Sequence, residues 1–213
     1  MPDGQRCSGS PVNLLSASTF NLSRDRTNAD KLCMVPGMAP VAVVLARTEE
    51  TVVAVTGIRA YPTGFGFTLT LRLRNLHPRE RRGFWPFPEF GYHGGRTVPA
   101  DAFRLTIEFA DGRSVNNLDP APSDPEVPAF EQPMLSSGPG TGLVGSGSSP
   151  DCWGWDMDYR ARPLPPPGPL AFICVWPERG IPPSRLEVDG AAVLGAADAA
   201  VRLWADDPYC SAD

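Results

Sequence analysis

The chain has 213 residues, of which 42% are hydrophobic, enough for one domain with a sizeable core. Its 25 prolines and 21 glycines argue against long helices, and its net charge of −5 argues against nucleic acid, which binds through a surplus of Lys and Arg. The five cysteines, an odd number without metal-ligand spacing, favour reduced thiols; with no signal-peptide pattern and no long apolar run, they predict a cytoplasmic protein without a membrane segment.

The N-terminal third predicts an arm followed by three antiparallel strands. Residues 1–40 are rich in Ser, Asn, Asp, Gly and Pro without periodicity, which is typical of a flexible arm. Residues 41–46 and 51–61 are expected strands, with Gly57 as a bulge, and residues 62–64 form a turn into the third strand. In that strand, residues 64–74, apolar side chains alternate with small, hydroxyl or guanidinium ones, so one face is predicted to be buried: Phe65, Phe67, Leu69, Leu71 and Leu73.

The middle of the chain predicts a second hairpin and then a long loop. Residues 103–109 and 113–118 read as two strands joined by a turn at Asp111 and Gly112. Residues 119–150 are so rich in Pro, Ser and Gly that we expect a long excursion without a buried face.

The last third predicts three strands and one helix. Residues 152–162 alternate again, and the apolar residues 170–176 follow a Pro-rich link; if these two strands pair, Tyr159 lies opposite Val175 and Arg160 opposite Cys174. Residues 184–188 form a short strand, and apolar spacings of three and four predict a helix over residues 191–204 that covers the second face of residues 170–176.

Seven or eight short antiparallel strands with breaker-rich links favour an all-β fold, a two-sheet β-sandwich with one C-terminal helix. An open β-barrel is the alternative. We expect one domain over residues 41–204, preceded by the arm and followed by a short tail, residues 205–213.

Three segments carry a resemblance to known sequences: residues 60–69 (AYPTGFGFTL), residues 109–113 (FADGR), and residues 155–159 (WDMDY) followed by PLPPPGPL and Trp176-Pro177. Together they resemble a family of uncharacterised β-rich proteins from GC-rich, actinobacteria-like bacteria. The resemblance implies that residues 41–204 form one unit, and it carries no activity, cofactor or site residue with it.

The strongest candidate for function is a loop that interleaves aromatic, basic and proline residues. We expect residues 79–93 to bind a protein partner, because aromatic and Arg side chains are the usual anchors of interfaces and the arginines suit an acidic partner. The same aromatics could instead roof the open end of the sandwich. The candidate binding residues are Arg79, Arg81, Arg82, Trp85, Phe87, Tyr92 and His93.

Two other functions remain open. Trp85, Trp153 or Trp155 could stack on a small ligand or a carbohydrate, and Asp156 and Asp158 could act as the acid and base of a hydrolase. However, alternating charges at Asp156, Asp158, Arg160 and Arg162 are typical of a solvated polar stripe. Two histidines are too few for a metal site, and we expect no metal and no cofactor; a non-enzymatic protein is favoured over an enzyme.

Overall fold

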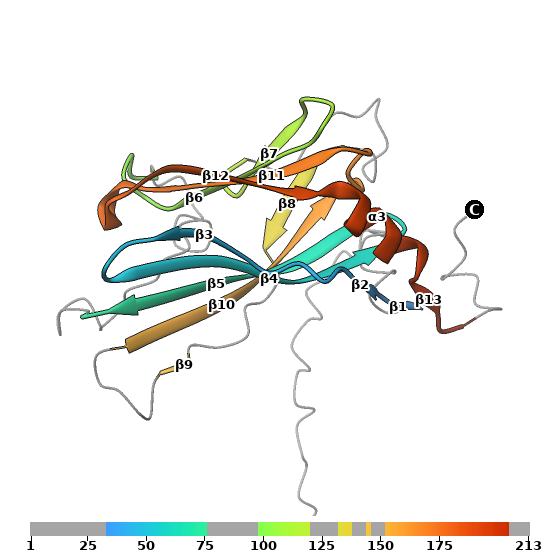
Figure 1. Cartoon of the computed structure of the whole chain (residues 1–213), viewed down its shortest axis with the longest axis horizontal. Helices are drawn as coiled ribbons and strands as arrows, with labels where there is room; N and C mark the ends of the chain where they lie inside the picture. The colour runs from blue at the N-terminus through green and yellow to red at the C-terminus, as the bar shows by residue number, and fades with distance from the viewer. Residues whose placement is uncertain (1–32, 76–97, 120–131, 138–143, 146–151, 205–213) are drawn as a thin grey trace, which may run out of the picture.

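The protein is a β-sandwich (Figure 1). The computed structural model describes residues 33–75, 98–119, 132–137, 144–145 and 152–204. Two antiparallel sheets face each other, and a helix lies at one end of the pair. No sheet in these ranges closes on itself, so the sandwich is confirmed and the barrel alternative is wrong.

The large sheet has the order β2-β4-β5-β10-β8, with β3 and β9 paired to β4 and β10, and the second sheet has the order β12-β11-β6-β7. The strands of the large sheet are β2 (Gly37–Met38), β3 (Val43–Arg47), β4 (Thr51–Tyr61), β5 (Gly64–Arg74), β8 (Met134–Ser137), β9 (Val144–Gly145) and β10 (Cys152–Arg162). Those of the second sheet are β6 (Arg104–Glu108), β7 (Ser114–Asn116), β11 (Pro169–Trp176) and β12 (Ile181–Asp189). The remaining elements are β1 (Met34–Val35), β13 (Val201–Arg202), the 3-10 helix η1 (Pro177–Arg179) and the helix α3 (Gly190–Asp198).

Strand β5 anchors the core, as its alternation predicts. Phe65, Phe67, Leu69 and Leu71 are fully buried, and the intervening residues from Thr68 onward face outward. The ring of Phe67 stacks on Tyr159 of β10 with centroids 5.5 Å apart and meets Phe172 of the facing sheet edge-on at 5.3 Å. The contact with Phe172 joins the two layers, whereas the contact with Tyr159 lies within the large sheet.

Both predicted hairpins are present. Strands β3, β4 and β5 are successive antiparallel neighbours, and the bulge falls at Gly57, whose φ of +59° suits glycine. Strands β6 and β7 pair around the turn at Asp111 and Gly112, where the amide of Arg113 donates to the Asp111 carboxylate.

The expected pairing of β10 with β11 is wrong. Strand β10 pairs with β5 and β8 in the large sheet, and β11 pairs with β12 and β6 in the second sheet. The Pro-rich residues 163–168 therefore carry the chain from one layer to the other. The alternation of β10 matches that of β5 over ten residue pairs, a longer apolar match than β11 offers.

The expected helix over residues 191–204 is also wrong at its end and in its position. Helix α3 ends at Asp198, and Val201 pairs with Val35 in a separate two-stranded sheet. The helix packs on β4 and β2, so it does not cover β11. Instead, Ala171 on the outer face of β11 is 1% exposed, and its register neighbours Glu108 of β6 and Glu187 of β12 both form ion pairs with Arg185 of β12.

Two segments expected to be irregular contain paired strands. Within residues 119–150, β8 pairs with β10 and places Leu135 in the core, and β9 pairs with β10 near Trp153. Within the expected arm, β2 pairs with β4 and Ala39 is buried, so the ordered part of the sandwich begins before residue 41.

Candidate functional site: a cationic corner of the large sheet

The predicted binding loop lies outside the described residues, but both of its anchor points lie inside them. Arg79, Arg81, Arg82, Trp85, Phe87, Tyr92 and His93 all fall between residues 76 and 97. The chain leaves β5 after Arg74 through Asn75, whose φ of 56° is a left-handed conformation that asparagine tolerates. The described surface around Arg74 is therefore the base of the loop.

That surface contains a pocket of about 350 Å³ at the turn between β3 and β4. We call it the cationic corner; its charged residues are Arg47, Arg72, Arg74, Glu49 and Glu50. The sheet register places Arg47 and Arg72 on either side of Val52, one on each neighbouring strand. Arg74 lies two residues beyond Arg72 and therefore on the same outward face.

The three arginines of the corner differ in their partners. Arg72 donates to both carboxylate oxygens of Asp156, at 3.0 and 3.1 Å, and lies across Gly154, where a Cβ would come within 3.0 Å of it. Glu50 accepts from the side-chain amide of Asn75 at 3.3 Å.

Neither Arg47 nor Arg74 forms an ion pair with any carboxylate of the described residues, and both side chains are exposed. Two guanidinium groups of the corner are thus available to a carboxylate from outside.

The two aspartates proposed as an acid and base sit in a ladder of salt bridges on the same outer face. Asp156 is bound by Arg72 and by Thr70 at 2.8 Å; Asp158 is bound by Arg59 and Thr68, each at 2.8 Å. Burial raises the pKa of Asp156, but the hydrogen bonds from Arg72 and Thr70, with the charge of Arg72, outweigh it and hold that pKa below its ordinary value. A general acid needs a raised pKa, so this environment does not support that role for Asp156.

The arginines further along β10 are not part of a solvated stripe, contrary to expectation. Arg160 and Arg162 are only 6% and 5% exposed. The guanidinium of Arg160 lies over the ring of Tyr61, 5.1 Å from its centroid, and donates to Thr63 at 3.3 Å. Strict alternation identifies the outward face of a strand, but it does not tell whether that face is covered.

The tryptophans proposed as stacking surfaces differ in accessibility. Trp155 is 3% exposed in the core, so its ring is closed to a ligand. Trp153 is half-buried and stacks on Trp155 with centroids 6.4 Å apart, and Trp85 lies in the undescribed loop.

The cysteines correct one prediction. Cys33 is disulfide-bonded, whereas Cys152 and Cys174 are free thiols, so the partner of Cys33 lies outside the described residues. Burial raises the pKa of the Cys174 thiol to about 11, which makes it unreactive in the folded protein. The expectation of reduced thiols therefore holds for Cys152 and Cys174 and fails for Cys33.

In the part of the chain that the structure describes, no three His, Cys, Asp or Glu side chains gather closely enough to hold a metal ion. No helix in the same residues has the length and hydropathy needed to cross a bilayer.

Comparison of the chain with family models, curated proteins and solved structures gives no match. The resemblance of residues 60–69, 109–113 and 155–159 to an uncharacterised family therefore stays a prediction.

Proposed function

We propose that this protein is a non-enzymatic interaction module that binds an acidic segment of a protein partner through residues 79–93 and the cationic corner at their base. One observation carries the proposal. Arg47 and Arg74 line an open pocket where β5 leads into the loop, and neither forms an ion pair with a described carboxylate.

The chemistry of arginine supports an acidic partner. A guanidinium group presents a fixed fork of donors that matches both oxygens of a carboxylate. Residues 79–93 add Arg79, Arg81 and Arg82, which follow Arg74 by five to eight residues, and Trp85, Phe87 and Tyr92 are of the types that usually supply the apolar anchors of interfaces.

The net charge of the whole chain opposes this attraction. At 0.1 M salt the repulsion between the net charge of −5 and an acidic partner is largely screened beyond about 10 Å, so it hinders the partner mainly at low salt and at close approach. We therefore expect binding that is local, modest in affinity and weakened by added salt.

The test is a fluorescence-anisotropy titration of a labelled poly-glutamate peptide with the full chain. The wild type should bind this probe, with an affinity that falls as sodium chloride is raised. A double variant, Arg47→Ala with Arg74→Ala, should weaken binding by about tenfold or more, since each carboxylate contact to a charged donor contributes about 1.5 to 3 kcal/mol.

The matched control is Arg185→Ala on the second sheet, an exposed arginine that already binds Glu108 and Glu187. This variant should bind the peptide like the wild type. Equal weakening by both changes, or no binding by the wild type at low salt, would exclude the proposal.

The compartment is a separate question. A cytoplasmic location stays a prediction, and the Cys33 disulfide counts against it because cytosolic thiols are normally kept reduced. Trapping of thiols by alkylation in intact cells, followed by mass spectrometry of the peptide that contains Cys33, tests it: an alkylated Cys33 supports the cytoplasm, and a bridged Cys33 opposes it.

A further inference from the structure

Arg72 is an arginine of the cationic corner whose position is fixed by the strands around it. Its Nη1 donates to the carbonyl of Leu71 at 2.9 Å and to that of Trp155 at 3.3 Å. Nη1 and Nη2 also donate to the two carboxylate oxygens of Asp156, at 3.0 and 3.1 Å. These hydrogen bonds hold a side chain that is still 47% exposed.

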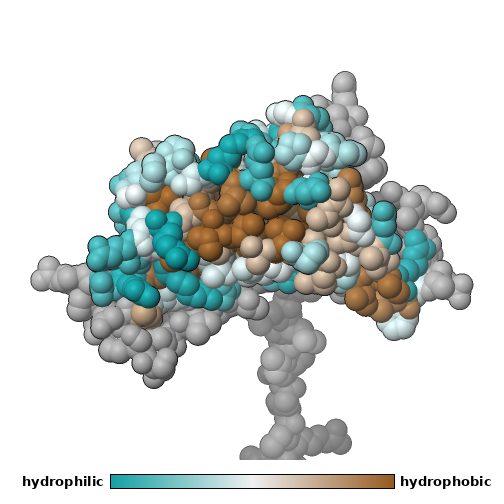
Figure 2. Space-filling view, in the orientation of Figure 1, coloured by the Kyte–Doolittle hydropathy of each residue, from teal (hydrophilic) through white to brown (hydrophobic). Residues whose placement is uncertain are grey.

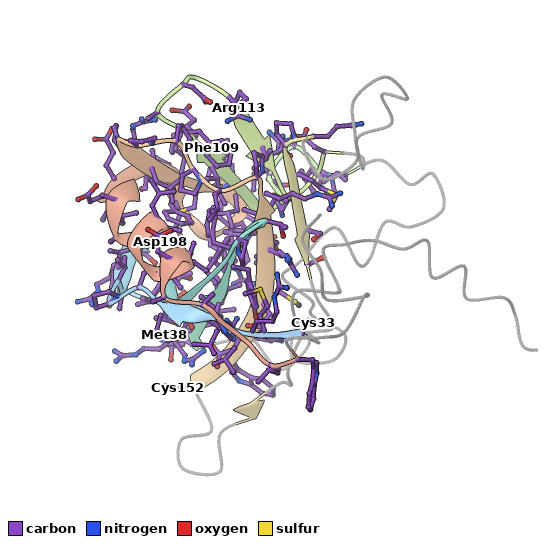
Figure 3. All side chains as sticks on the ribbon, turned by 90° about the vertical axis from the view of Figure 1, so that its right-hand side faces the viewer. Cys33, Met38, Phe109, Arg113, Cys152 and Asp198 are labelled. Carbon is purple, nitrogen blue, oxygen red and sulfur yellow. The ribbon has the colours of Figure 1, made fainter. Side chains whose placement is uncertain are left out.

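The room for this arrangement comes from Gly154, the residue opposite Arg72 on β10. An added Cβ at Gly154 would lie 3.0 Å from Nη1 and 3.1 Å from Cδ of Arg72, so the guanidinium crosses β10 where no side chain blocks it. Figure 3 shows Cys152, two residues before Gly154, at one end of β10 and on the opposite side of the molecule from Phe109 and Arg113.

The hydrogen bonds to Asp156 use only one of the two forks of the guanidinium group. Arginine has five N–H donors in one plane, and Asp156 takes the end-on fork formed by Nη1 and Nη2. The Nε–H and the second N–H of Nη2 form the side-on fork, and no acceptor among the described residues takes either of them. Because Nη1 lies on the edge that faces the two backbone carbonyls, the side-on fork lies on the opposite edge and faces away from the sheet.

The neighbouring ion pair on the same outer face is built differently. Arg59 donates from Nη2 to one oxygen of Asp158 at 2.8 Å, a contact typical of surface ion pairs that contribute little to stability. Arg72 lines the pocket of the cationic corner, whereas Arg59 is not among the residues that line it. The two arginines therefore form a matched pair for comparison.

Charge alone attracts an acidic group to the corner only weakly. Glu49 and Glu50 line the same pocket as the three arginines, and their carboxylates offset part of the positive charge. Figure 2 shows this hydrophilic surface at the left, where Figure 1 places the turn between β3 and β4. Selective binding at this surface therefore depends on directional hydrogen bonds from a donor in a fixed position.

We infer that Arg72 is the fixed donor of the cationic corner: Asp156 holds its guanidinium in place, and its side-on fork binds a carboxylate of the acidic segment. The inference rests on the proposed function, because it concerns the same ligand at the same surface. Two parallel N–H donors match the two oxygens of one carboxylate. Binding also costs less conformational entropy at Arg72 than at Arg47 or Arg74, which no described carboxylate holds.

Variants that preserve charge test the inference in the anisotropy titration with labelled poly-glutamate. Arg72→Lys keeps the positive charge but replaces the fork with a point charge, and it should weaken binding by about tenfold. Gly154→Ala changes no charge but displaces the guanidinium, and it should weaken binding by about two- to tenfold, the cost of immobilising one long side chain. The matched control, Arg59→Lys, makes the same change in the neighbouring ion pair and should bind like the wild type.

A spectroscopic measurement separates a direct contact from a structural role of Arg72. In the wild type, the ¹H–¹⁵N resonance of the Arg72 Nε–H should shift as poly-glutamate binds, because a carboxylate replaces water at that group. A saturated complex in which this resonance stays in place overturns the inference. An Arg72→Lys variant that binds as tightly as Arg59→Lys overturns it as well.

The same titrations distinguish failure of this inference from failure of the proposed function. If Arg47→Ala with Arg74→Ala weakens binding while Arg72→Lys and Gly154→Ala do not, the inference is wrong and the proposed function stands. If the wild type does not bind poly-glutamate, both are wrong. Circular dichroism confirms that each variant is folded, and if Gly154→Ala is not, Arg72→Lys and the Nε–H resonance decide the outcome.

Discussion

Two neighbouring residues of β5 provide a sharp test of the face assignment on which the sandwich depends. Leu71 is fully buried between the sheets, whereas the side chain of Arg72 is 47% exposed on the outer face. Truncation of each to alanine removes a large side chain from the same strand, at positions one residue apart. The comparison therefore isolates the direction in which the side chain points.

The expected costs differ several-fold. Leu71→Ala loses the transfer free energy of the removed methyl and methylene groups and leaves a cavity, which together cost about 2 to 5 kcal/mol. Arg72→Ala loses a half-exposed ion pair with Asp156, and such pairs contribute about 0.2 to 1 kcal/mol.

Urea denaturation followed by tryptophan fluorescence and far-ultraviolet circular dichroism measures both costs. In thermal melts of a chain of this size, each kcal/mol corresponds to about 2 to 4 °C in Tm, so Leu71→Ala should lower Tm by roughly 4 to 20 °C and Arg72→Ala by less than about 4 °C. Equal losses in the two variants would refute the assignment of faces in β5.

Three other predictions follow from local contacts. Folding lowers the pKa of Asp156 below its unfolded value near 3.8, so its ionised form stabilises the protein above that pH, and this contribution is lost as the pH falls through the lower folded pKa. In acid titrations, the difference in unfolding free energy between the wild type and Asp156→Asn should therefore be constant from pH 7 to about 4.5 and shrink below about pH 4. Thiol titration of the unfolded chain should find three of the five cysteines reactive, since the Cys33 disulfide uses two; five reactive thiols would contradict the disulfide. Cys174 should react only after unfolding. Gly37→Ala should destabilise the protein by about 1 to 3 kcal/mol or more, because the added Cβ collides with Ala196. Gly195→Ala has open space around it in α3 and should stabilise the protein by up to about 1 kcal/mol. Thermal melts that rank the two variants the other way would disprove the packing of α3 on β2.

The strands that could be predicted are those with one face buried and one face polar. In β5 and β10 every second side chain is apolar, and this period alone gives their bounds and their buried faces. Strand β11 is apolar on both faces, so its composition does not distinguish one partner strand from another. Pairing it with its neighbour in sequence was therefore wrong, because β10 has a longer apolar match with β5.

Tertiary contacts account for the other differences. Val201 continues the helical spacing of Val193 and Ala197, yet it pairs with Val35 from the other end of the domain, and a single stretch of sequence cannot reveal such a long-range partner. The burial of Arg160 depends on what covers the outer face of β10, which its own alternation does not encode.

The candidate site could be predicted only in part from the sequence. The arginines of residues 79–93 stand out by their density, whereas Arg47 and Arg74 are unremarkable members of two strands. The corner is identified only by the register that places Arg47, Val52 and Arg72 in one row, and by the turn between β3 and β4, whose Glu50 carbonyl accepts from the amide of Arg74 at the end of β5.

The most direct measurement of the proposed function is a two-dimensional ¹H–¹⁵N spectrum of the arginine Nε–H groups during titration with poly-glutamate. The resonances of Arg47 and Arg74 should shift together with those of the arginines in residues 79–93, while that of Arg185 should stay in place. Saturable binding that leaves Arg47 and Arg74 unshifted would contradict it.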